Sequence, residues 1–214
     1  MALIRVINPN SNADVTAGLA EALAPFEIPD RIEIVCETLE NGPFGIESQR
    51  DVESVTLPLV ARMQERPADA FVIACYSDPG LALCRSEISA PVFGIQESAM
   101  TTALTRGDRF GVIAIANASI PRHLRAIRAA ALDGRLAGER ALNLTVAESA
   151  TEGVFDRLQA VGEALINQDG ADVLILGCAG MARHRRRLEQ DLGRPVIEPT
   201  QAAVANAMGV LLTR

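Results

Sequence analysis

The sequence predicts an α/β protein of two similar lobes, each a short, mostly parallel sheet flanked by helices, related by a pseudo-two-fold axis. Short apolar runs alternate with helical patterns of about 10 to 15 residues, which is typical of parallel sheets. The segment DAFVIAC, ending at Cys75, is echoed about 100 residues later by DVLILGC, ending at Cys178. A chain of 214 residues accommodates two lobes of about 100 residues each.

We therefore expect residues 1–97 plus 200–214 to form a first lobe that carries Cys75, and residues 98–199 to form a second lobe that carries Cys178. A further pair of segments supports this duplication. The run PVFG that begins at Pro91 is echoed by PVIE beginning at Pro195, with nearly the same offset as the cysteine segments.

The elements of the first lobe follow from its apolar runs and turn formers. Strands are expected at 3–7, 31–36, 69–74 and 91–95, and helices at 14–24, 47–66, after Gly80 and at 97–105. The first strand ends in Asn8-Pro9-Asn10-Ser11-Asn12, which mixes turn formers with a helix cap. Polar side chains of this turn should lie at the carboxyl edge of the sheet.

The second lobe repeats the alternation of strands and helices. Strands are expected at 110–115, 141–146, 172–176 and 194–197, and helices at 121–131, 152–168, 181–192 and 200–212. Its first strand runs into the polar turn Ala116-Asn117-Ala118-Ser119, which is comparable to the turn at Asn10. The two lobes are therefore expected to present similar polar edges.

Composition excludes several classes of function. A formal charge of −7 and a pI near 4.9 disfavour nucleic-acid binding, which needs a concentrated basic surface. The basic run from Arg183 to Arg187 is expected to be a solvated helix, because consecutive residues point all round a helix. No apolar run reaches the roughly 18 residues of a membrane span, and the first residues enter a strand directly. We expect a cytoplasmic protein without a membrane or nucleic-acid partner.

The four cysteines are expected to be free thiols of two kinds. Cys36 and Cys84 lie within apolar segments and are expected to be structural. Cys75 and Cys178 each end a strand and precede a small-residue turn, so they should lie at the sheet edge where ligands bind and where helix N–H groups favour a thiolate. Zinc-ligand spacing and Gly-rich phosphate motifs are missing, which predicts no metal and no cofactor.

Two opposed cysteines predict proton transfer at a carbon acid. One sulfur removes a proton from one face of the carbon while the other delivers a proton to the opposite face. The enolate that forms needs hydrogen-bond donors. The expected substrate-binding residues are polar groups at the two edges and the turns after the cysteines: Asn10, Tyr76, Ser77, Asn117, Ser119, Ala179 and Gly180.

The sequence resembles a known family through four segments. They are INPNSN from Ile7 to Asn12, Gly42-Pro43 with Ile46-Glu47-Ser48, ACYSDPGL from Ala74 to Leu81, and LGCAGM from Leu176 to Met181. Together they look like hydantoin and allantoin racemases of the aspartate/glutamate racemase superfamily. The resemblance implies a two-lobed α/β fold, cofactor-independent racemisation of a 5-substituted hydantoin with Cys75 and Cys178 as acid/bases, and a homo-oligomer.

Other interpretations of the same residues stay open. A maleate-type cis/trans isomerase would use one cysteine to add to an alkene, and it would need two carboxylate anchors. A non-catalytic small-molecule binding protein would tolerate replacement of either cysteine. Cysteines at the ends of buried strands can also be inert core residues, although their matched positions in a repeat make this less expected.

Overall fold

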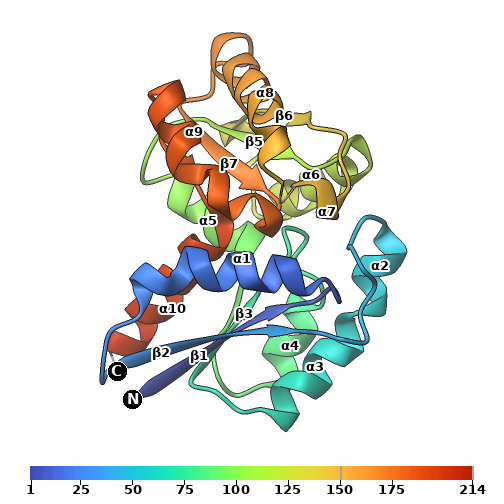
Figure 1. Cartoon of the computed structure of the whole chain (residues 1–214), viewed down its shortest axis with the longest axis vertical. Coiled ribbons are helices and arrows are strands. Elements are labelled where there is room, and N and C mark those ends of the chain that lie inside the picture. The colour runs from blue at the N-terminus through green and yellow to red at the C-terminus, as the bar shows by residue number, and fades with distance from the viewer. Residues whose placement is uncertain (150, 214) are drawn as a thin grey trace.

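The computed structural model describes residues 1–149 and 151–213, and it contains two four-stranded parallel sheets. The strand orders, β2-β1-β3-β4 and β6-β5-β7-β8, are the same in both sheets. Figure 1 shows the two sheets in two lobes along the long axis of the molecule, with the N-terminus in the first lobe. The predicted two-lobed α/β fold class is confirmed.

The elements of the first lobe lie close to the expected ranges. They are β1 (Ala2–Asn8), α1 (Ala13–Leu23), β2 (Ile32–Thr38), α2 (Gln49–Ser54), α3 (Thr56–Glu65), β3 (Ala70–Ile73), α4 (Leu81–Glu87), β4 (Val92–Gly94) and α5 (Ile95–Ala103). The predicted single helix over 47–66 is wrong, because the chain interrupts it at Val55. Pro58 lies in the first turn of α3, where its missing N–H cannot continue the hydrogen bonds of α2.

The second lobe and the closing helix follow in the same alternation. They are β5 (Phe110–Ala114), α6 (Ile120–Ala129), β6 (Leu136–Ala141), α7 (Val146–Ser149), α8 (Phe155–Asn167), β7 (Val173–Gly177), the 3-10 helix η5 (Ala179–His184), α9 (Arg185–Leu192), β8 (Val196–Ile197) and α10 (Pro199–Leu212). Within the basic run, His184 is buried at the end of η5, whereas Arg183, Arg186 and Arg187 are exposed.

The strand predicted at 141–146 is wrong, since the chain pairs with β5 through β6 at Leu136–Ala141. The segment contains Gly138, Glu139 and Arg140, which break the apolar pattern from which strands are predicted. Both side chains have polar partners in the folded protein. Glu139 contacts His123, and Arg140 donates hydrogen bonds to Asp169.

The lobes share a continuous core. α10 packs against β3 and β4 of the first sheet and against α5, while α5 also contacts β7 of the second sheet. α1 of the first lobe packs on η5 of the second. One buried hydrophobic cluster accordingly includes Val6 of the first sheet and Val112 of the second. The lobe boundaries proposed from the sequence stay a prediction.

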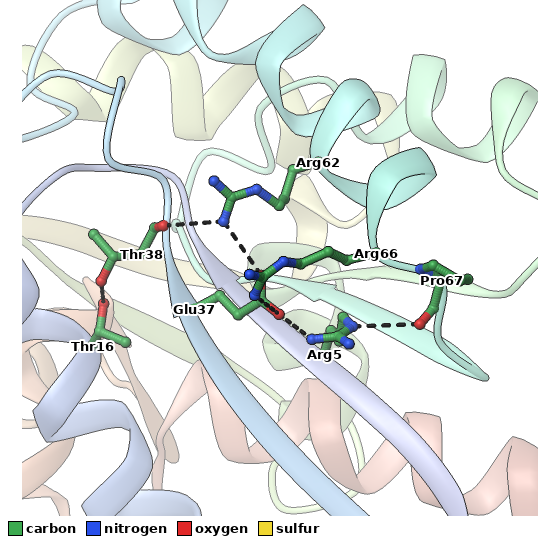
Figure 2. A network of polar contacts seen from close by, with 7 residues as sticks. All are labelled: Arg5, Thr16, Glu37, Thr38, Arg62, Arg66 and Pro67. Carbon is green, nitrogen blue, oxygen red and sulfur yellow. Dashed lines mark hydrogen bonds and ion pairs between the residues drawn. The ribbon is translucent and has the colours of Figure 1, made fainter.

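A buried carboxylate ties the edge of the first sheet to α3. Glu37 on β2 is 7% exposed and pairs with the side chains of Arg5, Arg62 and Arg66 (Figure 2). Arg62 also approaches the carbonyl of Thr38, and the Thr38 hydroxyl lies 2.6 Å from that of Thr16 on α1. The network therefore connects β1, β2, α1 and α3.

We predict that Glu37→Gln lowers the free energy of unfolding by about 1–3 kcal/mol, because it removes the charge from a buried carboxylate with three cationic neighbours. Urea unfolding followed by circular dichroism measures the change. The control is Glu33→Gln on the exposed face of the same strand, with an expected change within about 0.5 kcal/mol. Equal effects of the two substitutions would contradict a stabilising role for the network.

Candidate active site

A pocket between the lobes is lined by the carboxyl edges of both sheets and contains both matched cysteines. Cys75 follows β3 in the first lobe, and Cys178 follows β7 in the second. The other lining residues are Asn10, Val15, Ile46, Ala74, Tyr76, Ser77, Ile115, Arg122, His123, Val146, Gly177, Ala179 and Gly180. Cys75 and Cys178 are half-buried residues of the cavity lining, whereas Cys84 is buried in α4 and Cys36 lies on β2 away from the cavity.

The Cys75 sulfur is held by the tight turn that follows β3. The Ser77 N–H donates to this sulfur, and the Asp78 N–H donates to the Cys75 carbonyl at 2.9 Å. Asp78 adopts a positive φ of 43°, and its carboxylate accepts hydrogen bonds from the N–H groups of Gln96 and Glu97, both at 2.9 Å. The turn is thereby fixed to the first turn of α5.

The Cys178 sulfur occupies the start of η5. It accepts a hydrogen bond from the Gly180 N–H, and the Ser149 hydroxyl lies 3.8 Å away. Ser149 is fully buried and donates to the Val146 carbonyl at 2.7 Å. A side chain at Gly180 would come within 2.5 Å of the Ser149 hydroxyl, so only glycine permits this close packing.

Burial dominates the acid–base properties of both thiols. It raises the pKa of Cys75 to about 12, and the Ser77 N–H and the Arg122 guanidinium offset this rise only in part. Burial also raises the pKa of Cys178, against the hydrogen bond from the Gly180 N–H. The expectation that the following helix favours a thiolate is thus outweighed. For Cys75 that helix, α4, begins only at Leu81, beyond the turn.

A ladder of asparagines positions Asn10 in the cavity wall. The Asn8 amide donates to Asn10 Oδ1 at 3.0 Å, and the Asn12 N–H donates to the same oxygen at 2.9 Å. Asn12 in turn caps α1 through the Asp14 N–H. Because Asn10 Oδ1 already accepts two hydrogen bonds, its Nδ2 amide is the group left to donate to a ligand.

Arg122 is a cavity residue that was not predicted from the sequence. It projects from α6 of the second lobe, and its Nε donates to the Ser77 hydroxyl of the first lobe at 2.9 Å. Its Nη1 lies 3.3 Å from the Glu47 carbonyl and 3.2 Å from the Ala118 carbonyl. The guanidinium is therefore fixed at the junction of the two lobes.

His123 is a second cavity residue that was not predicted. Its Nδ1 lies 2.5 Å from Glu139 Oε1 on β6, and both side chains are only 2% exposed. The Tyr76 ring packs edge-on against the imidazole, with ring centroids 5.0 Å apart. Tyr76 is buried, and burial raises the pKa of its hydroxyl well above the ordinary value.

The predicted binding residues divide into two groups. Asn10, Tyr76, Ser77, Ala179 and Gly180 line the cavity beside the cysteines, whereas Asn117 and Ser119 do not. Asn117 is exposed, and its N–H bonds to Asn143. The Ser119 hydroxyl turns back to the Ala116 carbonyl at 2.7 Å. The Ser119 hydroxyl is thus used within its own 3-10 turn, and the Asn117 side chain lies outside the cavity lining.

Neither a metal cluster nor a membrane span is found in the described part of the chain. Residues 1–149 and 151–213 contain no group of three or more His, Cys, Asp or Glu side chains arranged to hold a metal ion. Over the same residues, none of the helices has the length and apolar character needed to span a bilayer.

The raised pKa of Cys75 predicts a steep pH dependence of alkylation. Far below a pKa of about 12 the thiolate fraction grows about tenfold per pH unit, so iodoacetamide should label Cys75 about 100-fold faster at pH 9 than at pH 7. Mass spectrometry of quenched digests measures the rate at each cysteine, with buried Cys84 as the internal control. We expect Cys75 or Cys178 to react before Cys36 and Cys84. A rate at Cys75 that levels off below pH 9 would contradict this prediction.

Comparison with known proteins gives consistent matches over nearly the whole chain. Residues 4–207 match the family model for Asp/Glu/hydantoin racemases. Hydantoin racemase of Paenarthrobacter aurescens is 33% identical over 207 residues, covering 94% of this chain and 87% of that protein. Hydantoin racemase of Pseudomonas sp. (strain NS671) is 34% identical over 212 residues, covering 94% of this chain and 82% of that protein.

Solved structures agree with these sequence matches. Allantoin racemase from Klebsiella pneumoniae superimposes with a TM-score of 0.94 at 25% identity, covering 100% of this chain and 89% of the other. Allantoin racemase from Pseudomonas fluorescens gives 0.93 at 28% identity, covering 99% and 91%. A glutamate racemase from Bacillus anthracis, at 22% identity and a TM-score of 0.71, shares the fold. The chain thus belongs to the Asp/Glu/hydantoin racemase family and is an isomerase.

Proposed function

We propose that this protein racemises 5-substituted hydantoins, allantoin among them, by proton transfer at C5 between Cys75 and Cys178, without a cofactor. The observation that carries the proposal is the shared cavity, which receives one thiol from each lobe. The similarity to hydantoin and allantoin racemases supports the substrate class. We also expect a cytoplasmic homo-oligomer.

The proposed reaction begins with one cysteine as thiolate and the other as thiol. The thiolate takes the C5 proton, and the electron pair of the broken C–H bond moves into the adjacent carbonyl to give an enolate. The opposite thiol then returns a proton to the other face of C5, so the sulfurs exchange protonation states. The Asn10 amide is suited to donate to the enolate oxygen, because its own oxygen is already occupied.

The cavity wall favours a hydantoin over a dicarboxylate. A maleate-type isomerase needs an anchor for each of two carboxylates, and cations provide the strongest such anchors. Among the described residues that line the cavity, Arg122 is the sole arginine or lysine. A neutral ring with carbonyl and N–H groups matches the amide, hydroxyl and backbone groups of this wall better than a dianion does.

The first test is proton NMR in D₂O with L-5-methylhydantoin or allantoin, following loss of the C5 proton while optical rotation is recorded. Exchange above the spontaneous rate, with decay of rotation, is expected from two-base transfer. Failure to exchange the C5 proton of any hydantoin above background would refute the proposal, and maleate would then be the next compound to assay.

The cysteine variants test whether each sulfur transfers a proton on only one face of C5. Cys75→Ala and Cys178→Ala should each lower racemisation at least about 100-fold, because each removes one of two required proton carriers. Each variant should still exchange the C5 proton of one enantiomer with retention, and the preferred enantiomer should differ between them. Cys84→Ala is the control outside the cavity. Full racemisation by either cavity variant would exclude the two-base mechanism and favour a binding protein or another chemistry.

A further inference from the structure

The cavity has a polar wall that proton transfer at C5 does not require. Arg122 and His123 are adjacent residues in the first turn of α6, and both line the cavity. Each is fixed by protein hydrogen bonds on one side, which leaves hydrogen-bonding capacity on the other. A polar group that lacks a protein partner loses hydrogen bonds when a ligand displaces water from it, unless the ligand supplies a replacement.

Arg122 presents a fixed donor. Its Nε and Nη1 are engaged by Ser77, Glu47 and Ala118. Its Nη2 has no hydrogen-bond partner among the described residues. Since a guanidinium carries donors only, this nitrogen can bind a carbonyl oxygen of a ligand.

His123 contributes an acceptor to the lining of the same cavity. An ionised Glu139 only accepts hydrogen bonds, so the proton of the contact between them belongs on His123 Nδ1. In the neutral imidazole the other nitrogen, Nε2, is then an acceptor, and no described residue donates to it. The edge-on contact with Tyr76 helps to fix the plane of the ring.

We infer that Arg122 and His123 form the subsite for the C5 substituent and select substituents that contain an amide or urea unit. Arg122 Nη2 donates to the carbonyl of that unit, and His123 Nε2 accepts from its N–H. The inference rests on the proposed function, because it takes the hydantoin ring to lie between the two sulfurs and beside Asn10.

Other substituents fit this wall less well. An alkyl or aromatic group would exclude water from both side chains without replacing its hydrogen bonds. A carboxylate would pair with Arg122, but its oxygens would face the lone pair of His123 Nε2, with the Glu139 carboxylate behind the ring. A neutral unit that both accepts and donates satisfies both groups at once.

The test compares allantoin, whose C5 substituent is a ureido group, with 5-methylhydantoin, which has the same ring and no polar substituent. The measured quantity is the ratio of kcat/KM for C5 proton exchange of the two compounds, each corrected for its spontaneous rate. The wild-type ratio should favour allantoin at least about tenfold. Arg122→Met and His123→Asn should each lower the ratio about 10- to 100-fold, as expected for loss of a buried hydrogen bond.

The variants are chosen so that folding does not obscure the result. The asparagine in His123→Asn can still donate to Glu139, and therefore the buried carboxylate keeps a partner. Arg125→Gln is the matched control, because Arg125 lies one turn along α6 and contacts Gln49 of the other lobe at 2.7 Å but does not line the cavity. Circular dichroism verifies the fold of each variant.

The outcomes separate the subsite from the proposed function. If the wild type exchanges both compounds without preference, the subsite is refuted and the racemase proposal stands. If Arg122→Met and His123→Asn reduce kcat/KM for both substrates equally, the two residues act on the ring or on the junction of the lobes and not on the C5 substituent, and the inference is again refuted. Exchange of neither compound by the wild type refutes the racemase proposal itself, and the inference that rests on it.

Discussion

The site depends on hydrogen bonds that join the carboxyl edges of the two lobes. Arg122 on α6 binds the Ser77 hydroxyl and the Glu47 carbonyl, and the Val146 N–H approaches the Glu47 carboxylate at 3.2 Å. These contacts bring the turn after Cys75 and the loop before α2 against the second lobe. Since each lobe supplies one sulfur, the separation of the Cys75 and Cys178 sulfurs depends on how the lobes meet at this junction and not on either sheet alone.

The burial that creates the cavity also determines the chemistry of its thiols. Removing a thiolate from water makes it less stable, and a less stable thiolate is a stronger base toward a carbon acid. The raised pKa values of Cys75 and Cys178 therefore reduce the fraction of reactive thiolate while they increase its basicity. Backbone N–H groups from Ser77 and Gly180 donate to the sulfurs, so they limit the loss of thiolate without removing the gain in basicity.

In each lobe a carboxylate caps the helix that follows the last strand of the sheet, but the carboxylate comes from a different position in the two lobes. Gly94 and Glu198 occupy matching positions before α5 and α10 in the repeated sequence. Glu198 caps α10 with its own carboxylate, whereas a Cβ at Gly94 would lie 2.3 Å from the Asp78 carboxylate, which caps α5 instead. The Asp78 carboxylate thus caps α5 and also holds the turn after Cys75 against that helix. Burial raises the pKa of this carboxylate to about 7.

The sequence by itself determined the fold class, the sheet edge that carries each cysteine and the cavity positions of Asn10, Ser77 and Gly180, because these follow from strand ends and local turns. It misplaced β6, whose polar residues Glu139 and Arg140 find their partners only in the folded chain. It also selected Asn117 and Ser119, which bond within or beside their own turn, and overlooked Arg122 and His123. Only the tertiary structure decided those four positions, because the packing of α6 against the first lobe and β6 determines which side chains enter the cavity.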